Sequence, residues 1–259
     1  GHALSVNVNG ITYTTANGLV VNAGLGTWSL NLPSTPASTY SVLARVTDSI
    51  GQTAEDITAS ELIIDTTPPA VPTVVSQITK NRTPTVTGTA TLAAGETLAV
   101  TINGTTYTTS NGLTVDPVAG TWSVTLPTTA DGTYAVTAVV TDSAGNSSTD
   151  ITSSELIIDN TAPLVPTVNS LITANTKPVL TGTALVAAGE TLRVTVNGAT
   201  YVVVPDSFGN WSLNTATAVP SSGTLGAFVD GQSYPVTATV TDAAGNSSTD
   251  ITTNELTIN

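Results

Sequence analysis

Apolar and polar residues alternate along most of this chain with a period of two, and no segment shows the period of a helix. Leu98, Val100 and Ile102 alternate with smaller or more polar residues, and Trp122 and Val124 continue the pattern further along. Such alternation predicts strands that bury one face and expose the other. The chain is therefore expected to be all-β.

Two-residue turn signals separate the alternating segments. Asn-Gly pairs occur at Asn9-Gly10, Asn103-Gly104 and Asn197-Gly198, and each is a strong signal for a hairpin. Short strands with turn signals between them are typical of an immunoglobulin-like sandwich. In the middle of the chain we expect strands at 73–79, 83–90, 98–102, 105–109, 122–126, 134–141 and 155–159, with a polar loop over 142–154.

One segment occurs three times, beginning at Thr47, Thr141 and Thr241, and its last two copies agree at 14 of 19 positions. A spacing of 94 and then 100 residues is that of whole domains. We expect tandem immunoglobulin-like β-sandwich domains in an extended linear array. The predicted domains are 1–65, a partial repeat that lacks its first strands, 66–159, a complete repeat, and 160–259, a complete repeat with an inserted loop at 214–229.

The charge of the chain limits its partners. Eighteen acidic residues face five basic ones, for a net charge of −13, and this argues against binding to nucleic acid. No apolar run is long enough to cross a bilayer, so we expect no direct membrane insertion of this segment. Cysteine is absent, so a secreted array of this kind needs another means of stiffening than disulfides.

Each repeat has one tryptophan at an equivalent place, and Tyr40, Tyr134 and Tyr234 are each expected to begin a long strand. Trp28, Trp122 and Trp211 are expected to fill the small cores, because Trp122 alternates with apolar neighbours on one face. Stacking of these rings on carbohydrate is the alternative. The threonine-rich strands would also suit binding to ice or another surface, but outward-facing threonine is common on ordinary strands.

Acidic residues gather at the linkers and at the loops that should meet them. Asp65 begins the first linker and Asp159 the second, each followed by a short proline-containing segment that is expected to be stiff. Carboxylates that converge repel one another unless a cation neutralises them, and oxygen ligands without His or Cys favour Ca²⁺. The predicted metal ligands are Asp65, Glu96, Asp142, Asp150, Asp159, Glu190, Asp242 and Asp250. The simpler interpretation is that the loop from Asp142 is a surface turn in which Asp serves turn formation.

Three motifs carry a family resemblance. They are Thr-Asp-Ser-Ala-Gly-Asn-Ser-Ser at 141–148, the linkers Asp-Thr-Thr-Pro-Pro and Asp-Asn-Thr-Ala-Pro, and Thr-Gly-Thr-Ala at 87–90 and 181–184. Together they resemble the bacterial Ig-like tandem repeats of giant RTX-type and biofilm-associated adhesins. The resemblance implies an extender region, stiffened by Ca²⁺ between domains, that carries terminal adhesive domains outside this segment. Gln52, in place of Asn146, and Asn259, in place of a linker acid, depart from the pattern.

We therefore expect a monomeric, non-enzymatic spacer on the surface of a Gram-negative bacterium, in contact with neighbouring repeats of its own chain. The only histidine is His2 and there is no cysteine, so no Ser-His-Asp set can form. One alternative is a carbohydrate- or surface-binding module whose binding loop is the insertion at 214–229. Another is an accessory Ig-like module of a secreted enzyme.

Overall fold

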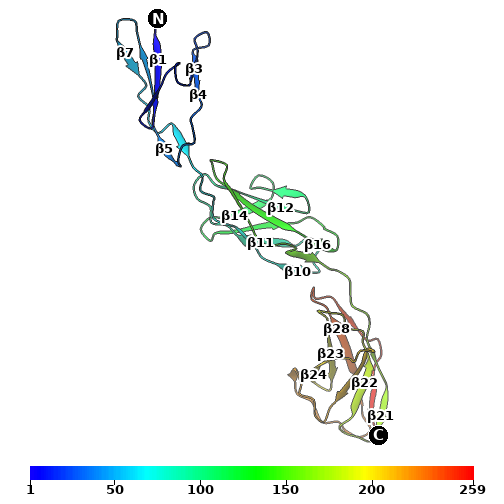
Figure 1. Cartoon of the computed structure of the whole chain (residues 1–259). Helices are drawn as coiled ribbons and strands as arrows, with labels where there is room; N and C mark the ends of the chain where they lie inside the picture. Colours follow the sequence, from blue (N-terminus) through cyan, green and yellow to red (C-terminus); the bar gives the residue numbers. More distant parts are fainter. The chain divides into compact units, whose positions relative to one another are not determined.

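The alternating segments form strands that are joined by tight turns. The computed structural model describes residues 1–259 and contains thirty strands and no helix (Figure 1). It therefore has no helix of the length and apolar character that crossing a membrane requires. At Asn103-Gly104 both φ angles are positive, 50° and 76°, and Ile102 pairs with Thr105, as the hairpin signal predicts.

Two units make up the chain, and the boundary between them passes through the second repeat. The first unit holds residues 1–72 together with 90–98 and 139–149. The second unit holds residues 73–89, 99–138 and 150–259. The first linker and the loops of the second repeat that meet it thus lie in one unit, and the second linker and its loops lie in the other.

The second repeat has eleven strands. One sheet has the order β14-β15-β11-β9, and the other strands form the sheets β13-β12-β17-β18 and β10-β19-β16. These strands are β9 (Thr73–Val74), β10 (Gln77–Thr79), β11 (Thr85–Thr89), β12 (Thr97–Ile102), β13 (Thr105–Tyr107), β14 (Leu113–Asp116), β15 (Thr121–Thr125), β16 (Gly132–Tyr134), β17 (Val136–Thr141), β18 (Ser147–Thr149) and β19 (Leu156–Ile158).

Three of the expected elements differ in the structure. The strand predicted over 134–141 is divided, because Tyr134 ends β16 and β17 begins at Val136 in another sheet. The single strand predicted over 73–79 is divided into β9, which pairs with β11, and β10, which runs parallel to β19. The chain changes sheets between them, and this is not visible in the local pattern. The polar loop predicted over 142–154 contains β18, which pairs with β17 through Ser148 and Val140. Its Ser and Thr residues do not show the apolar alternation by which we recognise strands.

The core of the second repeat lies between its sheets. Trp122 is 2% exposed and Val124 1%, so the prediction that this tryptophan fills the core is confirmed. Its indole Nε1 donates to the carbonyl of Thr73 at 3.1 Å, which satisfies the one polar group of the ring. The pocket for the ring requires Gly88, where a Cβ would lie 2.5 Å from the indole.

The third repeat has the same three-sheet topology as the second, but its sheets differ at their edges. It has no strand equivalent to β14, and its sheets have the orders β20-β22-β25, β21-β30-β27 and β26-β24-β23-β28-β29. These strands are β20 (Thr167–Val168), β21 (Leu171–Thr173), β22 (Val179–Thr183), β23 (Thr191–Val196), β24 (Ala199–Val203), β25 (Asn210–Asn214), β26 (Ser222–Gly223), β27 (Ser233–Tyr234), β28 (Val236–Thr241), β29 (Ser247–Thr249) and β30 (Leu256–Ile258).

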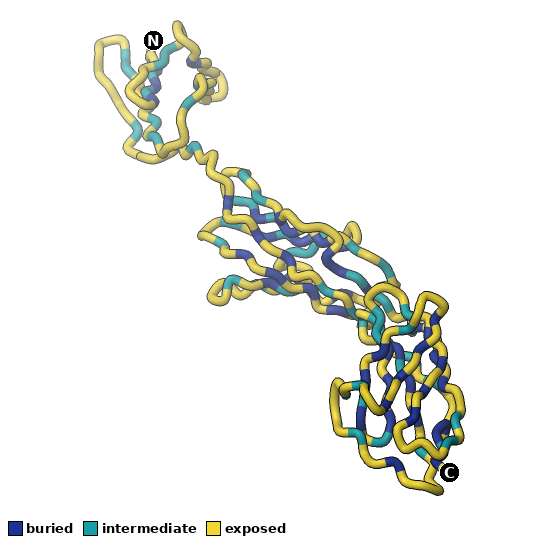
Figure 2. The backbone as a smooth tube through the Cα atoms, turned by 60° about the horizontal axis from the view of Figure 1, so that its bottom comes forward, coloured by how far each residue is buried: buried dark blue, intermediate teal, exposed yellow.

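The first repeat has only eight strands. A four-stranded sheet, β2-β1-β6-β7, accompanies two separate pairs, β3-β4 and β5-β8. Figure 2 shows few buried residues in this repeat and many in the other two. Its strands are β1 (Ala3–Val8), β2 (Ile11–Tyr13), β3 (Leu19–Asn22), β4 (Thr27–Leu30), β5 (Ser38–Tyr40), β6 (Val42–Thr47), β7 (Thr53–Glu55) and β8 (Leu62–Ile64).

In every repeat a tyrosine ends a short strand, β5, β16 or β27, and its hydroxyl forms a hydrogen bond with the turn before that strand. The hydroxyl of Tyr40 donates to Pro36 O, and that of Tyr134 donates to Ala130 O, both at 2.9 Å. This bond to a carbonyl four residues upstream resembles the tyrosine corner of immunoglobulin-like domains. In the third repeat Tyr234 instead accepts from Val229 N at 2.8 Å, because the insertion rebuilds this turn.

Candidate functional site

The two linkers have the same local structure. Asp65 Oδ1 accepts the N–H of Thr67, and Asp159 Oδ1 accepts the N–H of Thr161, both at 2.9 Å. An Asp that binds the backbone two residues on forms an Asx turn, and the prolines that follow restrict φ. Each linker acid therefore shapes its own linker.

The loop that begins at Asp142 is also an Asx turn. Asp142 Oδ1 accepts the N–H groups of Ala144 and Asn146, both at 2.9 Å, and Asp142 Oδ2 accepts the side-chain amide of Asn146 at 2.8 Å. The prediction that Asp142 serves turn formation in this loop is thus confirmed. Gly145 supplies the positive φ of 94° that closes the turn.

These hydrogen bonds act on the ionisation of the turn acids. The side-chain amide of Asn146 holds the pKa of Asp142 below its usual value, with help from backbone N–H groups. Burial raises the pKa of Asp242, but hydrogen bonds from Asn246 and the turn backbone outweigh it, and the pKa is lowered. Both carboxylates are therefore charged at neutral pH.

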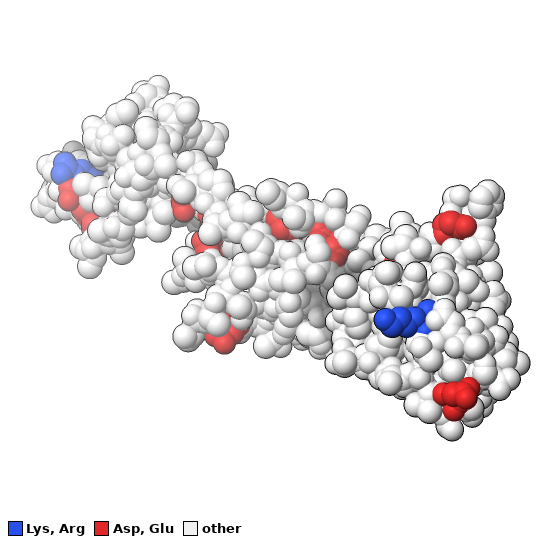
Figure 3. Space-filling view, turned by 90° about the horizontal axis from the view of Figure 1, so that it is seen from below, with Lys and Arg blue, Asp and Glu red and all other residues white.

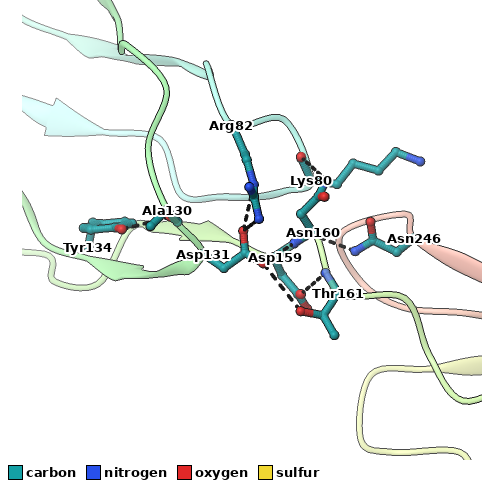
Figure 4. A network of polar contacts seen from close by, with 9 residues as sticks. All are labelled: Lys80, Arg82, Ala130, Asp131, Tyr134, Asp159, Asn160, Thr161 and Asn246. Atoms are coloured by element: carbon teal, nitrogen blue, oxygen red, sulfur yellow. Dashed lines mark hydrogen bonds and ion pairs between the residues drawn. The ribbon is translucent and has the colours of Figure 1, made fainter.

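An asparagine at the end of each turn connects the turn to the preceding linker. Asn146 Nδ2 donates to the carbonyl of Asp65 at 3.0 Å. Figure 4 shows the equivalent bond at the second linker, in which Asn246 Nδ2 donates to the carbonyl of Asp159 at 2.8 Å. A second bond follows two residues later at each place. Ser148 Oγ donates to Pro69 O at 2.7 Å, and Ser248 Oγ donates to Pro163 O at 2.6 Å.

The second linker is also held from the repeat that precedes it (Figure 4). Asp131 pairs with Arg82 at 3.0 Å and accepts the backbone N–H of Asn160 at 3.1 Å. Asn160 Nδ2 donates to Lys80 O at 2.9 Å, and Lys80 Nζ donates to Gly245 O at 2.8 Å. Asp131 precedes Gly132, and an Asp-Gly pair in a sequence signals a turn but no distant partner.

Three predicted metal ligands lie around one depression of about 670 Å³ at the second linker. They are Asp159, Glu190 and Asp242. Glu190 Oε2 accepts the N–H of Ala187 at 2.8 Å, and in the second repeat Glu96 does the same with Ala93. No three His, Cys, Asp or Glu side chains of the chain form a group that could hold a metal ion as they stand.

Comparison with known proteins identifies the second repeat. Residues 73–160 match the family model described as bacterial Ig-like domain. The second repeat is a bacterial Ig-like domain. The chain matches no curated protein.

Several solved structures resemble the chain. A 1.5-MDa bacterial ice-binding adhesin is 27% identical, with 100% of this chain and 87% of that chain covered and a TM-score of 0.39. A tetra-tandem repeat from the extending region of a large adhesion protein is 23% identical, with coverage of 100% and 67% and a TM-score of 0.33. The I-band fragment I67–I69 of titin is 12% identical, with coverage of 99% and 88% and a TM-score of 0.40.

Two further acids of the second repeat accept hydrogen bonds from the backbone of β17. Asp150 Oδ1 accepts the N–H of Ala138 at 2.6 Å, and Glu155 Oε2 accepts the N–H of Val136 at 2.9 Å. Between these acids the chain leaves the sheet, and Ser154 adopts a positive φ of 62°. The carboxylates thus take the place of carbonyls from the interrupted strand. The predicted ligand Asp150 is thus bound to the backbone of β17.

The third repeat contains the same arrangement. Asp250 Oδ1 accepts the N–H of Ala238 at 2.6 Å, and Glu255 Oε2 accepts that of Val236 at 2.8 Å. Asp250 does not line the depression around Asp159. The recurrence of Asp and Glu five residues apart was visible in the sequence, but their backbone partners lie on another strand. Sequence reasoning therefore missed the role of the glutamates.

The insertion of the third repeat packs onto its domain. Phe228 is 7% exposed and meets Tyr234 edge to face, with ring centroids 5.0 Å apart. Within the insertion, β26 extends the sheet by pairing with Ala199 and Thr200 of β24. The prediction of a loop is correct for most of this segment, but part of it belongs to the sheet and to the core.

Proposed function

We propose that this chain is a spacer segment of a bacterial surface adhesin, and that it sets the distance between terminal adhesive domains and the cell. The observation that carries the proposal is the repetition of the same two hydrogen bonds at both linkers. A short proline-containing linker that is also bonded to the next repeat has few orientations. Such a device suits a mechanical role, and its use at successive linkers suits an array.

The membership of the second repeat in the bacterial Ig-like family supports a bacterial source and a modular role. The resemblance of the turn and linker motifs to adhesin repeats supports the extracellular surface. On the face drawn in Figure 3 the charged side chains form small separate groups on a mostly uncharged surface. No broad charged patch suggests a polyanionic or polycationic partner on that face.

The spacer proposal is tested by small-angle scattering on the whole chain. The extended segment 132–141, which contains β16 and β17, rises about 3.3 Å per residue, so a domain with its loops is roughly 35–45 Å long. Three such domains in line exceed about 100 Å, and this is the maximum dimension we expect in calcium. A maximum dimension equal to that of a single compact globule of 26.0 kDa would contradict the proposal.

We further propose that Ca²⁺ binds at the linkers and stiffens them. The side-chain donors around the depression at the second linker are carboxylate and hydroxyl oxygens, which fit a hard cation. Asp159, Glu190 and Asp242 would hold the ion there, and Asp65, Glu96 and Asp142 are their counterparts at the first linker. Because these side chains do not form a metal group as they stand, binding would draw them together.

Calorimetric titration with Ca²⁺ tests this second proposal. We expect binding that is weakened at least tenfold by Asp242→Ala, and a higher melting temperature in calcium because the ion binds only the folded chain. Asp230→Ala is the matched control, since Asp230 lies outside the linkers and the depression. Absence of any binding would refute the calcium site and leave the spacer proposal standing.

A further inference from the structure

Three Asn-Gly pairs lie in the second and third repeats of the chain. They are Asn103-Gly104, Asn111-Gly112 and Asn197-Gly198. In an Asn-Gly pair the backbone nitrogen of the glycine can attack the side-chain amide of the asparagine, because glycine has no side chain to hinder a close approach. The three pairs are chemically identical, so only their surroundings can give them different reactivity.

Two of these pairs form the same hairpin turn in different repeats. Asn103-Gly104 joins β12 to β13, and Asn197-Gly198 joins β23 to β24. The φ angles of the two asparagines are 50° and 41°, and those of the two glycines are 76° and 88°. The turns therefore share one backbone conformation and differ in what packs against them.

The turn of the second repeat is open. Asn103 and Gly104 are both exposed, and Asn103 borders a hollow of about 250 Å³ beside Pro127 and Tyr134. A Cβ placed on Gly104 would have no atom within 4 Å. Both the amide and the nitrogen that would attack it thus have free space around them.

The insertion of the third repeat covers the equivalent turn. The N–H of Gly226 donates to Asn197 O at 2.9 Å, and Asn197 Nδ2 donates to Ala227 O at 3.1 Å. A Cβ placed on Gly198 would lie 3.1 Å from Thr224 O. The insertion therefore holds the amide that would be attacked and packs against the glycine whose nitrogen would attack.

The third pair is held by its own turn. Asn111 Oδ1 accepts the hydroxyl of Thr108 at 3.0 Å, and Asn111 Nδ2 donates to Thr106 O at 2.9 Å. Asn111 is as exposed as Asn103, but both ends of its amide have partners. In this respect it resembles Asn197.

We propose that Asn103 is a site of spontaneous deamidation, and that the insertion protects the equivalent Asn197. The nitrogen of Gly104 attacks Cγ of Asn103, and the C–N bond of the side-chain amide breaks. The proton of the Gly104 nitrogen leaves with the amide group as ammonia, and a succinimide ring remains. Water then opens the ring at either carbonyl and leaves aspartate or isoaspartate.

The reaction changes one edge of the second repeat. Either product adds a negative charge to the turn, and isoaspartate also adds a methylene to the backbone, which a two-residue turn does not accommodate. Pairing of β13 with β12 should weaken, and β13 lies at the edge of its sheet. In the third repeat β24 lies between β26 and β23, so the same change there would disturb an interior strand.

The test follows the whole folded chain during incubation at mildly alkaline pH, with peptide mapping by mass spectrometry at each of the three asparagines. We expect Asn103 to react roughly tenfold faster or more than Asn111 and Asn197, because those two react only after local opening. The chain in urea is the internal control, and there the three should react at similar rates. Equal rates in the folded chain, no reaction at Asn103, or the same order of rates in urea would overturn the proposal.

Gly226→Val tests the protective role of the insertion. A Cβ at Gly226 would lie 2.9 Å from Asn197 Nδ2, so the insertion or the amide must move. Asn197 should then react roughly tenfold faster, while Asn103 keeps its rate. The emission of the buried Trp211 shows whether the repeat stays folded, and if it does not, the comparison of the wild-type chain with and without urea decides. An unchanged rate at Asn197 in a folded variant would overturn the protective role.

Discussion

Asn146 reaches back from its turn and donates its side-chain amide to the carbonyl of Asp65 at 3.0 Å, while the same amide group also donates to Asp142 Oδ2 at 2.8 Å. One side chain thus binds both the linker and the turn that meets it. Asn246 does the same with Asp159 and Asp242. An alanine has no group for either bond, and a longer side chain would place its amide elsewhere.

Asn146→Ala should loosen the first linker and leave the second unchanged. The variant loses two hydrogen bonds, one to the linker carbonyl and one to the turn carboxylate. We expect faster proteolysis within 65–69 and unchanged cleavage within 159–163. Asn246→Ala should give the opposite pattern. Asn169→Ala is the control, since Asn169 bonds only to a neighbouring strand of its own repeat. Equal effects at both linkers would contradict the local role of each asparagine.

The acidity of Asp142 should depend on Asn146. The Asn146 amide is the largest cause of the lowered pKa of Asp142, so Asn146→Ala should raise that pKa toward its ordinary value. NMR titration of the side-chain carboxyl carbons measures this. Asp206 provides an internal control, because its pKa is lowered by Asn210 and should not move. An unchanged Asp142 in the variant would show that the backbone N–H groups alone set its acidity.

The linkers should weaken in acid. A carboxyl with a folded pKa below its unfolded pKa stabilises the folded state above the unfolded value, and that contribution is lost as pH falls through the folded value. For Asp142 and Asp242, cleavage of the linkers by an acid-active protease should rise as the pH falls below the ordinary pKa of an aspartate. Asp→Asn variants at both positions should flatten this dependence. A flat profile in the wild-type chain would contradict the prediction.

Gly88→Ala should destabilise the second repeat. A Cβ at this position would lie 2.5 Å from the Trp122 indole and closer still to the carbonyl of Thr73. Overpacking of this kind costs about 1–3 kcal/mol. Hydrogen exchange in β11 and β15 should therefore accelerate by roughly tenfold or more. Gly24→Ala is the matched control, since its nearest neighbour lies 3.5 Å away and its φ is not positive.

Glu155→Ala should also destabilise the second repeat. The N–H of Val136 loses its acceptor in a buried place, at a cost of about 1–3 kcal/mol. Glu61→Ala is the counterpart in the first repeat and removes the equivalent bond to Val42. Glu61 is exposed, so water can replace it and the effect should be smaller. Faster exchange of the Val136 amide, with a smaller change at Val42, would agree with the prediction.

Sequence reasoning was most successful where a feature depends on near neighbours. The alternation over 98–102 and the Asn103-Gly104 pair located β12, its turn and β13. The Asx turn at Asp142 could be expected from the motif alone, and the burial of Trp122 from its alternating neighbours. Each of these depends on the chain within a few residues.

The remaining features depend on partners far along the chain. Asp131 bonds to Asn160 and Arg82, and Asp150 bonds to Ala138, but no local pattern names these partners. The third repeat has no strand equivalent to β14, and β26 is added at the edge of another sheet. The difference in length between the repeats does not reveal which sheet gains a strand. The predicted calcium ligands depend on expected loop positions, which place residues at one end of a domain but do not fix side-chain directions.

The interruption of the sheet by Asp150 and Glu155 also bears on how a chain of near-identical domains avoids folding wrongly. Neighbouring repeats whose segments 141–159 and 241–259 agree at 14 of 19 positions are present at high local concentration while they fold, so one could take up a strand of the next. Strand β18 lies at the edge of its sheet but is only three residues long, and a loop with two carboxylates follows it. Short edges and charges at edges oppose pairing between molecules. Each repeat thus carries, beside its own core, a barrier to exchange with its neighbour during synthesis.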